Sequence, residues 1–375
     1  MSGATSPVLP RETLSLWLTL ARLPGVGGRT QRDLLNHFGS IENIFSAGRG
    51  QLDKVLTGKT EAVSGILNGP DAQNFQAEFD WLDQPRHHLL TWSNADYPPL
   101  LRQIPDPPVL LYVIGQPAVL SRPQIAVVGS RNPTPLGREN AQAFARSLAG
   151  AGLTVTSGLA LGVDGAAHRG ALAAGGLTIA VAGTGLDRVY PARHRELAHH
   201  IAENGALVSE YSLGTPPLPE NFPVRNRLIS GLSLGTLVVE AALQSGSLIT
   251  ARLATEQGRE VFAIPGSIHS PQARGCHALI REGAKLVETA QDILEELGPL
   301  AGVTRYIAPE NASPVPAIDP SMTTLLNQIG HDPVSIDALI ERSGLTAEAV
   351  SSMLLLMELN GLVASCPGGK IQRIS

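Results

Sequence analysis

Short apolar runs alternate with segments of helical pattern through the middle of this 375-residue chain. The apolar runs occupy residues 125–128, 153–156, 178–182, 206–209, 236–239 and 260–264. The intervening helical segments include residues 136–149, 164–174 and 193–203. Strand, glycine turn and helix in repeated order predict an α/β fold with a mostly parallel sheet and crossover helices on both faces. In such sheets, ligands bind beyond the carboxyl ends of the strands.

The turns that follow three of these runs have residues suited to holding a phosphate. They are Gly129-Ser130-Arg131, Ser157-Gly158 and Gly183-Thr184-Gly185. Arginine presents a planar fork of donors that matches phosphate oxygens, and glycine lets a ligand approach the backbone closely. Taken alone, each of these sequences is also explained by a tight turn with no ligand. Because the carboxyl ends of parallel strands meet at one edge of a sheet, their recurrence favours a polyanion site at that edge.

Two further polar stretches flank the run at 236–239. The segment Phe222-Pro-Val-Arg225-Asn226-Arg227 places two arginines beside an amide, just after a proline-rich turn. The turn Gln244-Ser245-Gly246-Ser247 adds an amide and hydroxyl groups. We expect both stretches to complete the polyanion site. Two alternatives stay open: both arginines lie on a solvated loop, or one of them serves the fold by pairing with Glu220 or Glu240.

Known nucleotide-binding motifs are missing from the central region of the sequence. An NAD site needs Gly-x-Gly-x-x-Gly after the first strand and an acidic residue after the second, and neither is present. Asp164 and His168 lie on one predicted helix face, which is compatible with acid–base chemistry or with a structural pair. Cys276 and Cys366 offer neither a disulfide framework nor metal-ligand spacing. We therefore predict no metal, no cofactor and no catalytic residue.

The segment before the predicted sheet is helical in pattern. Helices are predicted at residues 12–20, 30–38 and 40–45, within a small domain that spans residues 1–88. The stretch Leu23-Pro-Gly-Val-Gly-Gly28 resembles a helix-hairpin-helix turn, whose backbone N–H groups can hold a DNA phosphate. A plain connection between two helices is the equally weighted alternative.

The Rossmann-like region, residues 89–298, is followed by a different composition. Residues 299–318 form a predicted linker rich in proline and small residues. Residues 319–375 are predicted to form a winged helix, with helices at 322–329, 336–342 and 346–359 and a hairpin at 361–374. The helix at 346–359 contains neither lysine nor arginine, so we predict that this module does not grip duplex DNA.

The distribution of charge matters more than the total of −5. Residues 125–290 contain 14 Lys and Arg against 12 Asp and Glu, a balance of +2, so the remaining residues have a balance of −7. Residues 1–10 lack a basic flank followed by an apolar run, so no signal peptide is expected. No apolar run reaches about 18 residues, so we expect no membrane span. The two distant cysteines offer no disulfide framework, so we expect a reducing, cytoplasmic setting.

Across roughly residues 90–290, the motifs and their order resemble the DNA processing protein A (DprA, also called Smf) family. The matching stretches are VGSR at 128–131, SGLALGVDGAAH at 157–168, IAVAGTGLD at 179–187, YP at 190–191, FPVRNRLI at 222–229, EA at 240–241, SGSLITA at 245–251, VFAIPG at 261–266 and GCHALI at 275–280. The resemblance implies an extended Rossmann-like fold, flanked by a sterile-alpha-motif-like N-terminal domain and a C-terminal winged helix.

The resemblance also implies a function without catalysis. Proteins of this family bind incoming single-stranded DNA in natural transformation, protect it, load the RecA recombinase onto it, and act as homodimers through the Rossmann-like domain. The positions carried over to this chain are Arg131, Ser157, Gly158, Gly183, Arg225, Asn226 and Arg227. Leu161 stands where many relatives have arginine, and we expect Arg169 or Arg193 to compensate for the missing charge.

Two other classes of function are weighed against DNA binding. The first is a nucleotide or phosphoribosyl hydrolase of the LOG-like Rossmann group, which uses a Pro-Gly-Gly-x-Gly-Thr-x-x-Glu motif. Here Gly235-Thr-Leu-Val-Val-Glu240 lacks the Pro-Gly-Gly. The second is a plain interaction scaffold, which would bind no DNA. Since aromatic residues make up only 4% of the chain, we expect DNA affinity to come mainly from phosphate contacts and to fall steeply with salt.

Overall fold

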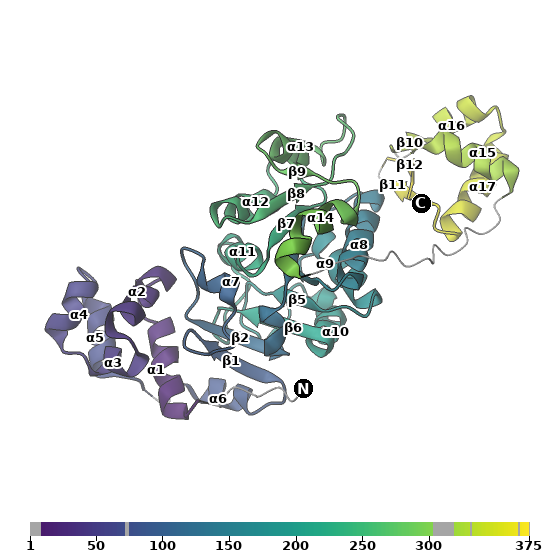
Figure 1. The fold of residues 1–375 in the computed structure, drawn as a ribbon. Helices are drawn as coiled ribbons and strands as arrows, with labels where there is room; N and C mark the ends of the chain where they lie inside the picture. Colours follow the sequence, from purple (N-terminus) through teal and green to yellow (C-terminus); the bar gives the residue numbers. More distant parts are fainter. Residues whose placement is uncertain (1–8, 72–74, 303–318, 331, 367, 375) are drawn as a thin grey trace.

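A nine-stranded sheet forms the centre of the protein, in a computed structural model that describes residues 9–71, 75–302, 319–330, 332–366 and 368–374 (Figure 1). The strand order is β1-β2-β6-β5-β4-β3-β7-β8-β9. The strands are β1 (His87–Thr91), β2 (Leu110–Gly115), β3 (Gln124–Val128), β4 (Thr154–Ser157), β5 (Thr178–Val181), β6 (Gly205–Ser209), β7 (Gly235–Val238), β8 (Glu260–Ala263) and β9 (Lys285–Leu286). The predicted apolar runs correspond to β3 through β8.

The sheet is mostly parallel, as predicted. Strands β3 to β9 pair with one another in parallel, whereas β2 is antiparallel to both β1 and β6. All five residues of β3 are buried, which is typical of a strand covered on both faces. Its side chains alternate between two cores: Ile125 and Val127 belong to one, and Ala126 and Val128 to the other.

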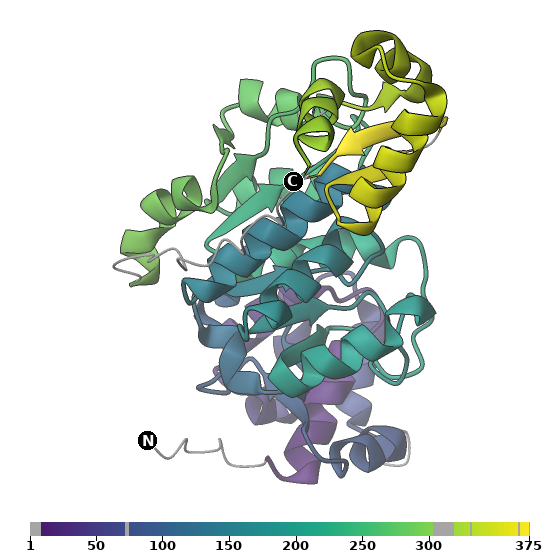
Figure 2. The same cartoon turned by 90° about the vertical axis from the view of Figure 1, so that its right-hand side faces the viewer.

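Helices cover both faces of the sheet (Figure 2). One face packs against α8 (Pro135–Gly150), α9 (Val163–Ala173), α10 (Arg195–Asn204) and α14 (Ala290–Ala301). The other packs against α7 (Pro99–Arg102), α11 (Asn221–Leu232), α12 (Ser247–Glu256) and α13 (Arg274–Arg281). These crossovers confirm the predicted extended Rossmann-like architecture.

Six helices at the N-terminal end form what we call the N-terminal helical module. They are α1 (Arg11–Ala21), α2 (Gly28–Phe38), α3 (Ile41–Ser46), α4 (Arg49–Val55), α5 (Thr60–Asn68) and α6 (Gln76–Leu82). The three helices expected from the sequence correspond to α1, α2 and α3. Trp17 of α1 belongs to the same apolar core as Tyr112 of β2 and Leu207 of β6, so the module is packed onto the sheet by shared burial.

The turn at Leu23–Gly28 is occupied by contacts within the chain. The backbone N–H of Arg29, in the first turn of α2, donates to Oδ1 of Asp106 at 2.8 Å. Lys59 Nζ donates to the carbonyl oxygen of Gly25 at 2.6 Å. A carboxylate therefore takes the place that a DNA phosphate was expected to take at this helix N-terminus. The geometry favours the alternative of a plain helix–helix connection.

The C-terminal residues form a winged helix with its own core. Its helices are α15 (Pro320–Ile329), α16 (Ile336–Ser343) and α17 (Ala347–Leu359), and its sheet has β10 (Val334–Ser335), β11 (Val363–Cys366) and β12 (Lys370–Arg373). Leu339, Val350 and Met357 are buried in this core. The predicted three helices and hairpin are confirmed. The most proline-rich part of the predicted linker, residues 308–317, lies outside the described residues.

The segment with the two arginines is a helix and not a turn. Residues 221–232 form α11, one turn of which places Arg225 in the interior of the protein. The alternative in which both arginines lie on a solvated loop is therefore wrong. Within the described part of the chain, every helix is too short or too polar to cross a bilayer.

Candidate nucleic-acid interface

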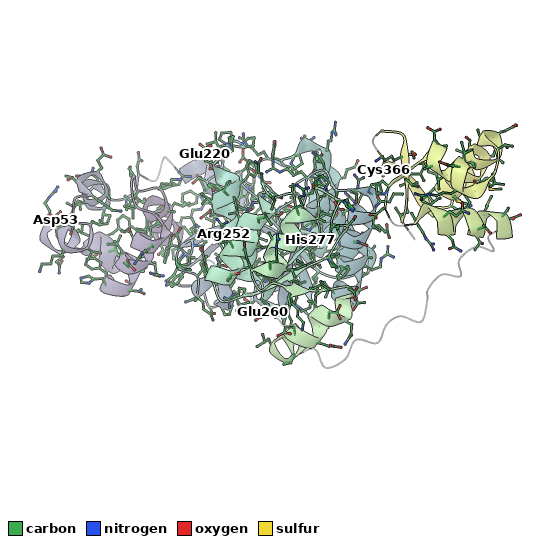
Figure 3. All side chains as sticks on the ribbon, turned by 90° about the horizontal axis from the view of Figure 1, so that it is seen from above. Asp53, Glu220, Arg252, Glu260, His277 and Cys366 are labelled. Carbon is green, nitrogen blue, oxygen red and sulfur yellow. The ribbon has the colours of Figure 1, made fainter. Side chains whose placement is uncertain are left out.

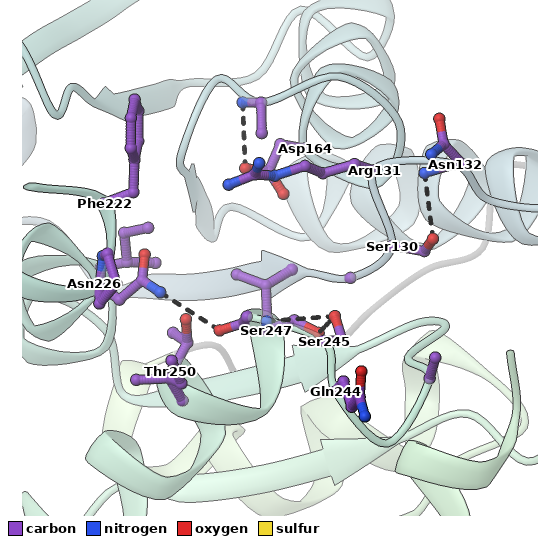
Figure 4. Close-up of a pocket in the computed structure, with 18 of the residues that line it drawn as sticks. Ser130, Arg131, Asn132, Asp164, Phe222, Asn226, Gln244, Ser245, Ser247 and Thr250 are labelled. Carbon is purple, nitrogen blue, oxygen red and sulfur yellow. Dashed lines mark hydrogen bonds between the residues drawn. The ribbon is translucent and has the colours of Figure 1, made fainter. Parts of the chain in front are cut away.

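A cavity of about 480 Å³ opens beyond the carboxyl end of β3. Strands β4 to β6 lie on one side of β3 and strands β7 to β9 on the other, so the order of the sheet reverses at this point. Open α/β sheets bind their ligands at such a reversal. Three segments form the walls: the turn after β3, the first two turns of α11, and the polar turn that begins α12 (Figure 4).

The cavity brings together residues that are far apart in the sequence. The predicted residues that line it are Gly129, Ser130, Arg131, Phe222, Arg225, Asn226, Ser245, Gly246 and Ser247. The predicted residues that lie elsewhere are Ser157, Gly158, Arg169, Gly183, Gly185, Arg193 and Arg227. The turns after β3 and before α12 thus meet as expected, while the turns after β4 and β5 support the cavity from outside its lining.

The turn after β3 is held by Glu240, which follows β7. The backbone N–H of Ser130 donates to the Glu240 carbonyl oxygen at 2.7 Å. The Glu240 carboxylate accepts from the backbone N–H of Thr134 at 2.9 Å and from its hydroxyl at 2.6 Å. Thr134 in turn caps α8 by accepting from the Gly137 N–H at 3.0 Å. Glu240 therefore shapes the wall of the cavity, and its carboxylate is not paired with either arginine of α11.

Arg225 is a buried cation at the base of the cavity. Only 4% of the residue is exposed, and burial lowers the pKa of its guanidinium to about 10, with the charge of Asp164 acting in the opposite direction. Asp164 Oδ2 accepts from the backbone N–H groups of Gly158 and Ala160 at 3.1 and 3.2 Å. Burial raises the pKa of Asp164, and Arg225 and these two donors oppose that change. With a pKa of about 10, the Arg225 guanidinium is charged at neutral pH.

The guanidinium of Arg225 has donors to spare. Among the described residues, no acceptor forms a hydrogen bond with its Nε or Nη1. A buried donor without an acceptor is costly, and a phosphate oxygen is the strongest partner available to a guanidinium. Because Arg225 lines the cavity, an anion that enters it can supply the missing acceptors.

Phe222 carries the aromatic surface of the site. The guanidinium carbons of Arg131 and Arg225 each lie 5.9 Å from its ring centroid, a cation–π arrangement. The Tyr190 ring lies 5.6 Å from the Phe222 ring, with half of the tyrosine exposed. A Cβ on Gly183 would lie 3.0 Å from the Phe222 ring, so this glycine makes room for the aromatic side chain. Gly183 and Phe222 thus act together, although only Phe222 lines the cavity.

The opposite wall consists of amide and hydroxyl groups. Ser245 and Ser247 share a hydrogen bond of 2.7 Å between their hydroxyl groups, and Asn226 Nδ2 donates to the Gly246 carbonyl oxygen at 3.4 Å (Figure 4). Lining residues that were missing from the predicted DNA-binding set include Asn132, Asp164, Gln244, Thr250 and Gln272. Asn132 follows Arg131 directly, so extending that motif by one residue would have found it, whereas Gln244 already belongs to the predicted polar turn. Nothing in the sequence around Gln272 identifies it.

Arg227 points away from the cavity into an ion-pair network. Its Nη2 pairs with Glu210, and its Nε lies 3.3 Å from Oδ2 of Asp106. The side chain of Arg227 is 12% exposed and that of Glu210 is 14% exposed. One of the two arginines does serve the fold, but the partners named as alternatives, Glu220 and Glu240, are wrong. The two arginines have different surroundings because positions two apart on a helix face in different directions.

Several other predicted residues do not line the cavity and instead make contacts within the fold or lie on the surface. The Ser157 hydroxyl donates to the Val127 carbonyl oxygen at 2.6 Å, inside the sheet. A Cβ on Gly185 would lie 2.6 Å from the Ser212 carbonyl oxygen. Arg169, in α9, and Arg193, in the short 3-10 turn just before α10, are both exposed. Leu161, where the resemblance implies an arginine, is 37% exposed and does not line the cavity, and neither Arg169 nor Arg193 lines it.

Asp164 and His168 have separate structural partners. His168 Nδ1 lies 2.7 Å from the Thr178 hydroxyl, which itself donates to the Val155 carbonyl oxygen at 2.7 Å. Burial lowers the pKa of His168 to about 3, so the imidazole is neutral. Asp164 contacts backbone N–H groups instead, which favours the structural interpretation of these two residues. Over the described ranges, no group of three or more His, Cys, Asp or Glu residues could hold a metal ion.

Comparison with known proteins places this chain and its fold in a family. Residues 88–298 match the family model of DNA recombination-mediator protein A, and residues 309–369 match the DprA winged helix domain. The Smf protein of Escherichia coli is 45% identical over 310 residues, covering 80% of this chain and 81% of the relative. The DNA processing protein DprA of Streptococcus pneumoniae is 49% identical over 260 residues, covering 68% of this chain and 92% of the relative.

Solved structures agree with the sequence comparison. The X-ray structure of S. pneumoniae DNA processing protein A covers 75% of this chain and 97% of its own, with 37% identity and a TM-score of 0.68. A structure concerned with the single-stranded DNA binding mode of DNA processing protein A from Helicobacter pylori covers 56% of this chain and 96% of its own, with 33% identity and a TM-score of 0.52. This chain belongs to the DNA processing protein A (DprA/Smf) family.

Proposed function

We propose that this protein binds single-stranded DNA in the cavity beyond β3, mainly through phosphate contacts and without catalysis. The observation that carries the proposal is Arg225, a buried guanidinium that lines the cavity with Nε and Nη1 unpartnered among the described residues. Arg131, exposed at the mouth, supplies a second cation. A polyanion satisfies both, because it offers acceptors and charge together.

An unpaired strand suits this cavity better than a duplex. Phe222 presents a ring on which an unstacked base can lie, and base–aromatic stacking is tolerant of sequence. The amide and hydroxyl wall formed by Asn226, Ser245 and Ser247 can bond to a base edge or to a sugar. In a duplex, stacking and pairing keep the bases away from such a recessed site. The single-strand binding mode described for the H. pylori relative supports this choice.

The wider role that we propose follows the family. The protein protects incoming DNA during natural transformation and loads RecA onto it, and two copies associate through the Rossmann-like domain. Membership of the DprA/Smf family supports these steps. Co-sedimentation of RecA with the protein and single-stranded DNA tests the RecA step, and sedimentation velocity tests the homodimer.

Fluorescence anisotropy tests the binding step. A labelled 30-nucleotide single strand and the matching duplex are titrated with protein at 50 and 200 mM salt. We expect the single strand to bind more tightly at both salts, and its affinity to fall steeply between them because counterions are released from the phosphates. Equal affinity for duplex, or an affinity that salt does not change, would contradict the proposal. Mononucleotides incubated with the protein should remain intact, whereas release of free base would indicate the LOG-like hydrolase instead.

A further inference from the structure

Helix α11 has a different environment on each of two sides. On one side, Phe222, Arg225 and Asn226 line the cavity. On the other, Arg227 donates a hydrogen bond to Glu210 and lies within ion-pair distance of Asp106, and these two carboxylates come from different parts of the chain. Glu210 follows β6 directly, and Asp106 lies in the loop before β2. The residues that line the cavity and the arginine that contacts these carboxylates therefore belong to one helix.

Asp106 also contacts the N-terminal helical module. Its Oδ1 accepts from the Arg29 backbone N–H at 2.8 Å, in the first turn of α2, while its Oδ2 lies 3.3 Å from Arg227 Nε. A single carboxylate thus bridges the module and α11. The Asp106 side chain is 47% exposed, in contrast to the largely buried Arg227 and Glu210. It is the outermost member of the network and the one that the module can reach.

The surroundings of Asp106 reinforce the bridge. Arg32 Nη1 donates to the Pro105 carbonyl oxygen at 3.1 Å, so a second residue of α2 grips the same loop. A Cβ on Gly28 would lie 2.6 Å from the Pro107 carbonyl oxygen and 2.7 Å from Asp106 Oδ1. Only a glycine at position 28 lets the module approach this closely. Module, loop and α11 are therefore in direct contact, one after the other.

We propose that Asp106 is a positioning residue that couples the N-terminal helical module to the single-stranded DNA cavity, acting through Arg227 and α11. This inference rests on the proposed function. Arg227 then aligns Phe222 and Arg225 without touching DNA. The module contributes to DNA affinity by holding the loop at Asp106, and its own helix N-terminus is not needed as a phosphate site.

The direction in which one substitution changes DNA affinity distinguishes a positioning role from a purely electrostatic one. Asp106→Asn keeps an oxygen that can accept from the Arg29 N–H but removes the charge beside Arg227. If Asp106 acted only as a negative charge near an anion site, its loss would strengthen DNA binding. Positioning predicts the opposite, a loss of three- to tenfold in affinity for single-stranded DNA.

Gly28→Ala tests the other end of the bridge without a change of charge. Its methyl group pushes α2 away from the loop, and we expect a similar three- to tenfold loss of affinity. Both substitutions break the same chain of contacts between α2 and α11. The loss of DNA affinity in the double variant should therefore be smaller than the product of the two single losses. The control is Asp53→Asn, the same chemical change at an exposed residue of α4 in the same module (Figure 3), which should bind within twofold of the unaltered protein.

Hydrogen exchange measures the coupling without DNA. We expect faster amide exchange across residues 221–232 in Asp106→Asn and Gly28→Ala, and no change there in Asp53→Asn. If the unaltered protein fails to bind single-stranded DNA while this exchange still accelerates, the proposed function is wrong and the coupling stands. If DNA binds, and Asp106→Asn binds as tightly or more tightly with unchanged exchange in α11, the coupling is overturned.

Discussion

Arg225 lies so close to Gly158 that a Cβ on the glycine would collide with Nη1 of the guanidinium. Gly158 follows β4 directly, and its backbone N–H donates to Asp164, the carboxylate that faces Arg225. The glycine does not line the cavity, yet it decides where the buried cation lies. Close approach of backbone to side chain is a use of glycine that no other residue can replace without movement.

Gly158→Ala should weaken single-stranded DNA binding about fivefold or more, because the methyl group displaces Arg225 from the base of the cavity. Anisotropy titration at one fixed salt concentration measures the effect. Gly150→Ala is the matched control, since a Cβ at that helical position meets no atom within 4 Å. The control should leave affinity unchanged and stabilise the fold by up to about 0.8 kcal/mol. Equal affinities for the two variants would show that the position of Arg225 is irrelevant to binding.

Arg131→Ala should weaken binding to all sequences alike and make the salt dependence shallower. The slope of log K against log salt should change by about 0.7 for one phosphate contact to a single strand. Titrations at four salt concentrations, on both a pyrimidine and a mixed sequence, measure it. Arg146→Ala, at an exposed arginine of α8 outside the cavity lining, is the control. A slope that changes equally in both variants would place the phosphate contact elsewhere.

The buried His168 predicts a pH dependence of stability. Burial lowers its folded-state pKa from 6.5 to about 3, so between these values the unfolded chain binds the extra proton. The stabilising contribution is complete above pH 6.5 and is lost as the pH falls, by about 2 kcal/mol at pH 5. Urea unfolding at pH 7.5 and 5 measures it. His168→Asn should lose less stability over this interval than the unaltered protein, whereas a variant at the exposed His200 should keep the full dependence.

Removal of residues 303–375 should leave duplex DNA binding within twofold of the intact chain. The helix that a winged helix would place in the major groove, α17, has neither lysine nor arginine and instead exposes Leu355, Leu356 and Leu359. Residues 319–375 contain three basic and six acidic residues, so their field repels phosphates. Titration of both chains with the same duplex at 50 mM salt measures the effect. A tenfold loss on truncation would mean that the module does grip duplex DNA.

Local sequence patterns predicted the strands well because a strand covered on both faces must be apolar along its whole length. Runs such as 125–128 and 236–239 meet this requirement and fit few other kinds of structure. The turn after β3 and the serine turn before α12 were also predictable, since parallel strands deliver their carboxyl ends to one edge. The helix at residues 222–232 was harder to predict, because its proline and its polar residues are not typical of a helix interior.

The two arginines of α11 mark the boundary between what sequence and structure decide. By itself, the sequence determined the sheet, its crossover helices, the winged helix and the family, because each depends on local pattern or on motifs in order. Only the tertiary structure decided that Arg225 lies buried at the cavity while Arg227 turns to Asp106 and Glu210. Their partners lie between 17 and 121 residues away along the chain. Ion pairs over such separations exist only once the chain has folded, so no local pattern encodes them.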